Sequence, residues 1–395
     1  MESRKGGTQR IPELDGVRGV AILMVLAWHY GFCQVKMDSP GWLHKAVRPL
    51  QMTWSGVDLF FVLSGFLITG ILLEHRNAGN YYKVFYVRRA CRILPIYIVV
   101  MGGLWVLTGL GLASQEGFQW LLGHGFPWWT YATFTQNFAM ASRGNFGAHG
   151  TGVTWSLAVE EQSYLCMPLL VRWCEGRRLL VACVAGVAIA LILRIWSGGF
   201  HAFVLLPWRM DSVLFGAIAA MAVRHSGVRA VIDSHGRRYA FLVAGLAVAP
   251  VLSTIHSGWW GAWTHFWLAA FYAGFIVLVC TQRNGWVAGC VRQRWLMVLG
   301  QISYSLYMFH QIVSGLLHAG FKRQEPSLRD AGDAVLTCSA LAISVAAAWV
   351  SYTYCESYWM KWGHGFRYAD GTDAKDSSQA PVLERRNGPL SDPTS

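Results

Sequence analysis

Residues 14–30 read LDGVRGVAILMVLAWHY, an almost unbroken apolar run that contains two basic side chains, Arg18 and His29. The run approaches the roughly twenty residues that an α-helix needs to cross a bilayer. The whole chain has the same character, because 54% of its 395 residues are hydrophobic and only 14% are charged. A soluble domain of this size would carry about a quarter of charged residues. The sequence therefore predicts an integral membrane protein.

Apolar stretches of spanning length recur along the chain. They lie near 17–33, 56–73, 93–112, 153–171, 179–197, 203–223, 239–256, 264–281, 296–318 and 334–355. Apart from Arg194 and Arg209, which lie within stretches, 24 of the Lys and Arg residues fall on the side of the N-terminus and 7 on the other side. Since cytoplasmic loops carry the excess of Lys and Arg, we expect an all-α bundle of about ten transmembrane helices with both termini in the cytoplasm.

Polar segments frame this membrane domain. We expect a cytoplasmic N-terminal segment over 1–10, a transmembrane domain over 11–362 and a disordered cytoplasmic tail over 363–395. The first apolar run lacks a small-residue cleavage site, so no removed signal peptide is expected. The net charge of +12 is divided among short clusters between apolar stretches, which favours topology over a nucleic-acid partner. The nine Cys form no CxxC pair, so no metal site is predicted.

The longest outer connection, 113–152, is rich in Trp, Phe and Gly and almost uncharged. This composition predicts a segment that lies against the membrane interface or dips back between helices. There it would shape an entrance for a substrate.

The first stretch places two basic residues eleven positions apart. Eleven residues make about three helical turns, so Arg18 and His29 project from nearly the same face. The rise of about 1.5 Å per residue puts them roughly 16 Å apart, with His29 near mid-membrane. A neutral buried imidazole can remove a proton from an attacking hydroxyl. A hydrogen bond to a neighbouring helix explains His29 alone equally well.

The loop before the third stretch contains FYVRRACRILP, in which Arg89 and Arg92 are three residues apart. On a helix starting near Tyr86 they would share a face, as a fork for a pyrophosphate or phosphoadenosine. The positive-inside rule alone is the stronger interpretation of these arginines in isolation.

Acidic residues interrupt the fourth and sixth stretches. Glu160 and Glu161 lie within TWSLAVEEQSYL, and Arg209 and Asp211 within LLPWRMDSVLFG. Adjacent acids inside a membrane are costly unless they are protonated, paired or facing water, so we expect them to line a functional cavity. Structural pairing of Glu160 or Glu161 with Arg209 is the alternative.

Two further stretches carry candidate site residues. Asp58 lies near the outer end of the second stretch, where it either serves the site or ends the helix. In the ninth stretch, Ser303, Tyr307 and His310 follow a three-to-four spacing and share a face, and Tyr304 lies beside them. Hydrogen bonds between helices and contacts with a ligand explain these residues equally well.

Taken together and in this order, these segments resemble the acyltransferase-3 family of bacterial membrane O-acyltransferases. The matching pieces, which span about 11–362, are Arg18-x10-His29, GVDLFFVLSGFLI around Asp58, RRACRILP with Arg89 and Arg92, TWSLAVEEQSY with Glu160 and Glu161, PWRMDSVLFG with Arg209 and Asp211, GQISYSLYMFHQ with Tyr304 and His310, and ESYWMKW at Glu356.

The resemblance implies an enzyme that takes an acyl group from acyl-CoA, usually acetyl-CoA, and passes it to a hydroxyl of a surface polysaccharide, a lipid-linked sugar or a glycosylated natural product. It also implies a multi-pass protein of the bacterial inner membrane that modifies the cell envelope. In this family the His of the Arg-x10-His motif is the proposed catalytic residue and the Arg-x-x-Arg motif the proposed donor contact. These roles fall here on His29, Arg89 and Arg92. Some members carry an esterase-like domain, which we expect this chain to lack.

The residues and the resemblance together support one mechanistic hypothesis. Arg18, Arg89 and Arg92 bind the phosphates of the donor, and His29 acts on the acceptor hydroxyl with Glu160 or Asp58 as its acidic neighbour. The residues expected to contact the acceptor are Glu161, Arg209, Asp211, Tyr304 and His310. Acetyl-CoA is expected as a cosubstrate, with no permanently bound cofactor.

Other function classes stay open from the residues alone. A secondary transporter could use the buried acids and histidines as a proton relay, although the sequence shows no convincing internal repeat. The acyltransferase could also act with glycan-assembly proteins, or the chain could be a catalytically silent helper of such a complex. Thermal stabilisation by CoA would separate the enzyme from the transporter.

Overall fold

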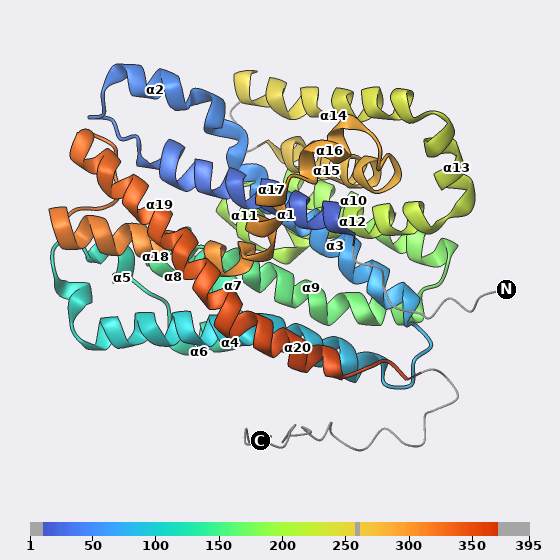
Figure 1. Cartoon of the computed structure of the whole chain (residues 1–395), viewed down its shortest axis with the longest axis horizontal. Helices are drawn as coiled ribbons and strands as arrows, with labels where there is room; N and C mark the ends of the chain where they lie inside the picture. Colours follow the sequence, from blue (N-terminus) through green and yellow to red (C-terminus); the bar gives the residue numbers. More distant parts are fainter. Residues whose placement is uncertain (1–10, 257–260, 370–395) are drawn as a thin grey trace, which may run out of the picture.

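The computed structural model describes residues 11–256 and 261–369, and the regular structure in these residues is entirely helical. The ten longest helices are α1 (Pro12–Leu26), α3 (Gly56–Glu74), α4 (Tyr81–Gly109), α9 (Thr154–Trp173), α10 (Arg177–Trp196), α12 (Leu206–Arg224), α14 (Gly236–His256), α15 (Ala262–Thr281), α18 (Ser303–Lys322) and α19 (Ala331–Ser351). Each of the ten predicted stretches overlaps one of these helices. Most of them run along the longest axis of the molecule (Figure 1).

Seven segments in the described residues are long and apolar enough to cross a membrane, which supports a multi-pass membrane protein. They are Pro12–Gln34, Gly41–Glu74, Tyr81–Gly109, Arg177–Trp196, Phe200–Arg224, Ala262–Thr281 and Ala331–Gly365. The helices α9, α14 and α18 are not among them. Ten spans with cytoplasmic termini therefore stay a proposal.

Shorter helices connect the long ones. They are α2 (Gly41–Val47), α5 (Gln119–Leu122), α6 (Trp128–Ala132), α7 (Gln136–Arg143), α8 (His149–Gly152), α11 (Phe200–Val204), α13 (Ser226–Ser234), α16 (Trp286–Val291), α17 (Arg294–Gln301) and α20 (Ser357–Gly365). In Figure 1, α2 and α5 lie at the left-hand end of the bundle, whereas α13 and the loop between α3 and α4 lie at the right. The predicted outer and inner segments thus separate to opposite ends.

Three predicted boundaries differ from the structure. The ninth stretch is divided at Ile302 into α17 and α18. The helix with Arg89 and Arg92 begins at Tyr81 instead of near Tyr86, so both arginines lie within one continuous helix. The predicted tail boundary at residue 363 falls inside α20, and Ala369 still donates a backbone hydrogen bond to Asn80 at 2.9 Å. The predicted segments 1–10 and 370–395 lie outside the described residues.

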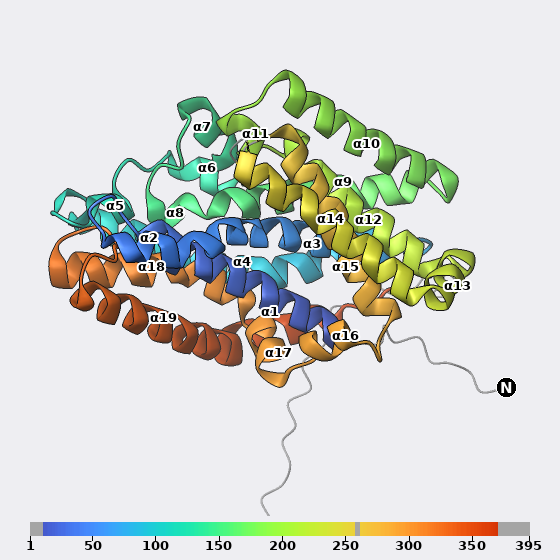
Figure 2. The same cartoon turned by 90° about the horizontal axis from the view of Figure 1, so that it is seen from above.

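Helix α3 lies inside the bundle in both views (Figure 1 and Figure 2) and contacts α1, α9, α12 and α15. Its closest approach is to α12, where a Cβ on Gly65 would lie 2.0 Å from the carbonyl oxygen of Val213. A Cβ on Gly216 would lie equally close, 2.0 Å, to the carbonyl oxygen of Val62. Small residues of this kind let two helix backbones touch inside a membrane, where no hydrophobic effect drives the helices together. The glycines therefore fix the central helix pair against which the site is built.

Candidate active site

Two cavities lie one after the other along α1. The first, which we call the inner cavity, has a volume of about 90 Å³ and is lined by Arg18, Arg89, Arg92 and Glu160 among mainly apolar residues. The second, which we call the outer cavity, has a volume of about 310 Å³ and contains His29. Two residues, Val57 and Tyr307, line both cavities. The three arginines and His29 therefore lie on either side of one pair of residues.

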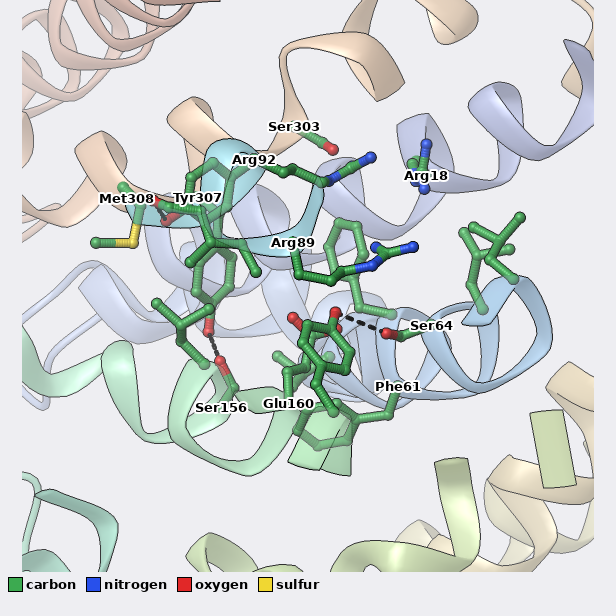
Figure 3. Close-up of a pocket in the computed structure, with 18 residues that line it drawn as sticks. Arg18, Phe61, Ser64, Arg89, Arg92, Ser156, Glu160, Ser303, Tyr307 and Met308 are labelled. Atoms are coloured by element: carbon green, nitrogen blue, oxygen red, sulfur yellow. Dashed lines mark hydrogen bonds between the residues drawn. The ribbon is translucent and has the colours of Figure 1, made fainter. Parts of the chain in front are cut away.

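Three arginines from two helices converge on the inner cavity. Figure 3 shows the guanidinium groups of Arg18, Arg89 and Arg92 gathered at one side, while Glu160 enters from α9. Arg18 contacts Asp15 at 3.4 Å. Within the described part of the chain, no carboxylate lies within 4.0 Å of Arg89 or Arg92. Like charges in a largely apolar cavity repel one another, so this group is suited to bind an anion with several oxygens.

Arg88, the first arginine of the RRACR segment, does not line the cavity. Arg88 donates two hydrogen bonds to the carbonyl oxygen of Phe366, at 2.7 and 3.1 Å, and its guanidinium packs over the ring of Tyr368. It holds the chain that follows α20 against α4. The three-residue spacing of Arg89 and Arg92 therefore separates the cavity-facing arginines from a structural neighbour, as the periodicity predicted.

In the outer cavity His29 faces a second imidazole, that of His310. The Nδ1 atom of His29 lies 3.0 Å from the carbonyl oxygen of Val25 and 3.2 Å from Nε2 of His310. The Nδ1 atom of His310 lies 2.7 Å from the carbonyl oxygen of Tyr307. A carbonyl oxygen only accepts, so both neutral rings carry their proton on Nδ1. His310 Nε2 then accepts from His29, and the lone pair of His29 Nε2 is left to take a proton.

Local backbone geometry supports this pair. After α1 the chain continues through a π-helical turn over Ala27–Gly31, which contains His29. Turns of this type occur often at functional sites because they change which side chain faces a given direction. In the same turn, Tyr30 donates a hydrogen bond of 2.7 Å to the carbonyl oxygen of His310. The π-helical turn thus contacts His310 twice, at its side chain through His29 and at its backbone through Tyr30, and His310 is fully buried.

The connection 113–152 supplies part of the outer cavity wall; its predicted place at the membrane interface stays a prediction. Trp120, Phe146 and His149 line the cavity, and the ring of His149 stacks on that of Trp120 with centroids 4.4 Å apart. Lys36, which pairs with Glu325 at 3.2 Å, adds a charge to the wall.

Several predicted site residues lie elsewhere. Asp58 accepts a hydrogen bond of 2.7 Å from Arg209, which also contacts His265, and Asp211 pairs with Arg194. We call these five residues the buried ion-pair cluster. Both arginines and both aspartates are at most 4% exposed, and none of them lines either cavity. Arg209 pairs with Asp58 and not with Glu160 or Glu161, the pairing that the sequence left open as an alternative. In this cluster the carboxylates of Asp58 and Asp211 neutralise the charges of Arg209 and Arg194.

The acidic partner expected for His29 is replaced by His310. Glu160 lines the inner cavity instead of the outer one, and Asp58 is held by Arg209. Glu161 lines neither cavity, and its Oε1 atom is buried without a hydrogen-bond partner among the described residues. Tyr304 lines the inner cavity and donates to the carbonyl oxygen of Ile93 at 2.8 Å. The catalytic and acceptor-binding roles of these residues stay predictions.

The sequence indicates no site role for Ser156 or His149, and Tyr307 stands out in it only as a member of a polar helix face. The signal for Tyr307 was its helical spacing from His310, and Tyr307 and His310 both line the outer cavity. No spacing rule reports on His149, because it lies in α8, a helix of a single turn that is too short to show periodicity in the sequence.

Comparison with known proteins agrees with this arrangement. A family model described as an acyltransferase domain matches residues 11–353. A protein of Staphylococcus aureus (strain COL), whose name assigns it provisionally to the O-acetyltransferases, is 27% identical over 354 residues, covering 81% of this chain and 54% of that protein. The peptidoglycan O-acetyltransferase OatA of Listeria monocytogenes is 30% identical over 204 residues, covering 47% of this chain and 28% of that protein.

A third relative, the O-acetyltransferase OatA of Staphylococcus aureus (strain NCTC 8325 / PS 47), is 24% identical over 331 residues, covering 76% of this chain and 50% of that protein. The chain thus spans about half the length of the first of these relatives. No solved structure matches the chain. Because the family model covers most of the chain and its matched segment contains both cavities, the chain belongs to the acyltransferase-3 family.

Proposed function

We propose that this protein is a membrane O-acetyltransferase that moves an acetyl group from acetyl-CoA in the inner cavity to a hydroxyl of a carbohydrate in the outer cavity. The observation that carries the proposal is the meeting of the two cavities at Val57 and Tyr307, with an arginine cluster on one side and an imidazole with a free lone pair on the other. Its relatives carry names of O-acetyltransferases, one of them acting on peptidoglycan.

The inner cavity accounts for the donor. The phosphates of CoA carry several negative oxygens, and guanidinium groups bind such oxygens through paired hydrogen bonds. Arg89 and Arg92 have no described carboxylate to neutralise them, so the donor would supply the missing charge. The largely apolar remainder of the cavity suits the pantetheine arm and the acetyl group.

The outer cavity contains the general base of the proposed reaction, His29. His29 Nε2 takes the proton of the acceptor hydroxyl as the oxygen attacks the thioester carbonyl carbon. The new C–O bond forms, the C–S bond breaks, and the proton on His29 returns to the thiolate of CoA, so the reaction is proton-neutral. His310 accepts the hydrogen bond from His29 Nδ1 and thereby holds the required tautomer.

The walls of the outer cavity suit a sugar. Trp28, Trp54, Trp120 and Trp155 line it together with polar groups such as Gln34. Indole faces contact the C–H faces of a pyranose ring, while amide and imidazole groups bind its hydroxyls. A surface polysaccharide, a lipid-linked sugar or a glycosylated product of the cell envelope would fit such walls. The protein would then act in the bacterial inner membrane together with glycan-assembly proteins.

The proposal is tested with the full chain purified in detergent. Acetyl-CoA is mixed with soluble peptidoglycan fragments or methyl glycosides, and released CoA is measured as free thiol while mass spectrometry detects the acetylated sugar. Wild type should release CoA only when an acceptor is present. His29→Ala should lose about 10²–10⁴-fold in rate, the usual contribution of a general base.

A control separates catalysis from folding. His44 is an exposed histidine of α2 outside both cavities, so His44→Ala should keep the wild-type rate. A folded His29→Ala protein that binds acetyl-CoA and still acetylates at the wild-type rate would remove His29 from the mechanism. A wild-type protein that transports a solute but neither binds CoA nor releases it would instead support the transporter alternative.

A further inference from the structure

We propose that Val57 and Tyr307 form the constriction through which the acyl group passes and that they restrict the donor to short acyl chains. The inference rests on the proposed function. Among the described residues, these are the two that line both the inner and the outer cavity. The thioester sulfur approaches from the arginine side and the attacking oxygen from the His29 side. The acyl carbon that joins them must therefore lie between Val57 and Tyr307.

Val57 is fixed from behind by α1. It is the second residue of α3, and the preceding Gly56 lies so close to α1 that an added Cβ would be 2.6 Å from the carbonyl oxygen of Ala21. The same Cβ would be 3.2 Å from a methyl group of Val25, a residue of the outer cavity. The backbone at Val57 therefore cannot retreat from the passage, and its two methyl groups set the width on this side.

Tyr307 is fixed by its hydroxyl. Its Oη atom lies 2.7 Å from Oγ of Ser156 and donates to the carbonyl oxygen of Val153 at 3.1 Å, which ties α18 to the start of α9. The pair of hydroxyls at Tyr307 and Ser156 is visible in Figure 3. The ring also meets Phe60 edge-on, with centroids 6.4 Å apart. Since the carbonyl oxygen of Tyr307 accepts from His310, the constriction and the histidine pair share one residue.

This rigidity gives the constriction its selectivity. A two-carbon acyl group passes with its methyl group beside Val57, whereas each added methylene has to occupy space that the valine methyls and the tyrosine ring already fill. Extra methylenes in a well-packed apolar site are unfavourable because neighbouring side chains must leave their preferred rotamers. One methylene in such a pocket commonly changes specificity by about 10-fold or more.

The test compares acetyl-, butyryl- and hexanoyl-CoA with the same purified protein and the same acceptor. Wild type should prefer acetyl-CoA over butyryl-CoA by at least about tenfold in kcat/KM. Val57→Ala should raise the butyryl-to-acetyl ratio by about tenfold, and Val57→Ile should lower it. Tyr307→Phe, which keeps the ring but releases it from Val153 and Ser156, should also raise the ratio. Because each ratio is measured within one preparation, it does not depend on the fraction of folded protein.

The matched control is Val62→Ala, the same substitution in the same helix at a buried position outside both cavities. It should lower stability without moving the ratio. A wild type that uses hexanoyl-CoA as well as acetyl-CoA, or Val57→Ala and Tyr307→Phe proteins with the wild-type ratio, would overturn the constriction while leaving the acetyltransferase intact. A wild type that turns over none of the thioesters would overturn the proposed function itself.

Discussion

Two groups of arginines lie within this helical bundle, and they have opposite surroundings. Arg194 and Arg209 are buried and each contacts an aspartate, whereas Arg89 and Arg92 line a cavity and have no described carboxylate within 4.0 Å. In the sequence, Arg194 and Arg209 interrupt apolar stretches, whereas Arg89 and Arg92 directly precede one. The difference teaches that an intramembrane charge indicates a ligand only when it faces a cavity without a partner. A charge that is neutralised by a neighbouring helix holds the fold together.

The largest effect is expected in the buried ion-pair cluster. Asp58→Ala leaves the charge of Arg209 buried and uncompensated, which should cost about 3–5 kcal/mol of folding free energy. The variant would unfold at a distinctly lower temperature or denaturant concentration in detergent. The double variant Asp58→Leu/Arg209→Leu, which removes both charges, should recover part of the loss. An Asp58→Ala protein as stable as wild type would show that the cluster does not hold the fold.

The arginines of the inner cavity should behave in the opposite way. Arg89→Ala/Arg92→Ala removes two charge-assisted contacts worth about 1.5–3 kcal/mol each, so CoA affinity should fall by about 100-fold or more. Stability should stay unchanged, because the substitution also removes repulsion between like charges. Calorimetric titration with CoA measures the affinity, and a melting curve measures the stability.

Lys83 provides the matched control for this pair. It is an exposed cation two turns earlier on α4 and lines neither cavity, so Lys83→Ala should bind CoA as wild type does. Unchanged CoA affinity in Arg89→Ala/Arg92→Ala would return both arginines to a purely topological role. A large loss of stability would instead place them with the buried ion-pair cluster.

The smallest effect is expected at an exposed ion pair. Asp330 precedes α19 and accepts hydrogen bonds from Lys322 at 2.7 and 2.9 Å and from the backbone of Asp333, which lowers the pKa of its carboxyl. Its folded-state pKa is therefore below the unfolded value, so its stabilising contribution is present above about pH 4 and is lost as the pH falls further. Wild type should lose slightly more stability than Asp330→Asn between pH 5 and pH 3, and equal losses would contradict the pairing.

The sequence predicted the helices better than the contacts between them. Ten apolar stretches became ten long helices because the length and polarity of a segment are local properties. The three-residue spacing of Arg89 and Arg92 and the shared face of Tyr307 and His310 were predictable for the same reason, since helical periodicity fixes them. The alternation of charged connections also anticipated which loops lie at the same end of the bundle (Figure 1).

Partners between helices could not be predicted, because they depend on packing of distant segments. Arg209 is 151 residues from Asp58, and His310 is 281 residues from His29. Periodicity gives the face of each helix but not the helix that it meets, so Glu160 and Asp58 were chosen as partners of His29 when the structure supplies His310. The stacked pair Trp120 and His149 could not be predicted as part of the cavity wall, because the helices that carry them, α5 and α8, are too short to show a periodic pattern in the sequence.

Proteoliposomes test most directly whether an acetyl group passes through the protein from acetyl-CoA on one side of the membrane to an acceptor on the opposite side, as we propose. Soluble peptidoglycan fragments are trapped inside, and acetyl-CoA with a labelled acetyl group is added outside, where its charge prevents it from crossing the bilayer. We predict that the label appears on the trapped fragments and that free CoA is released outside. The His29→Ala variant should neither label the fragments nor release CoA. Label found only on fragments added to the same side as acetyl-CoA would contradict the account.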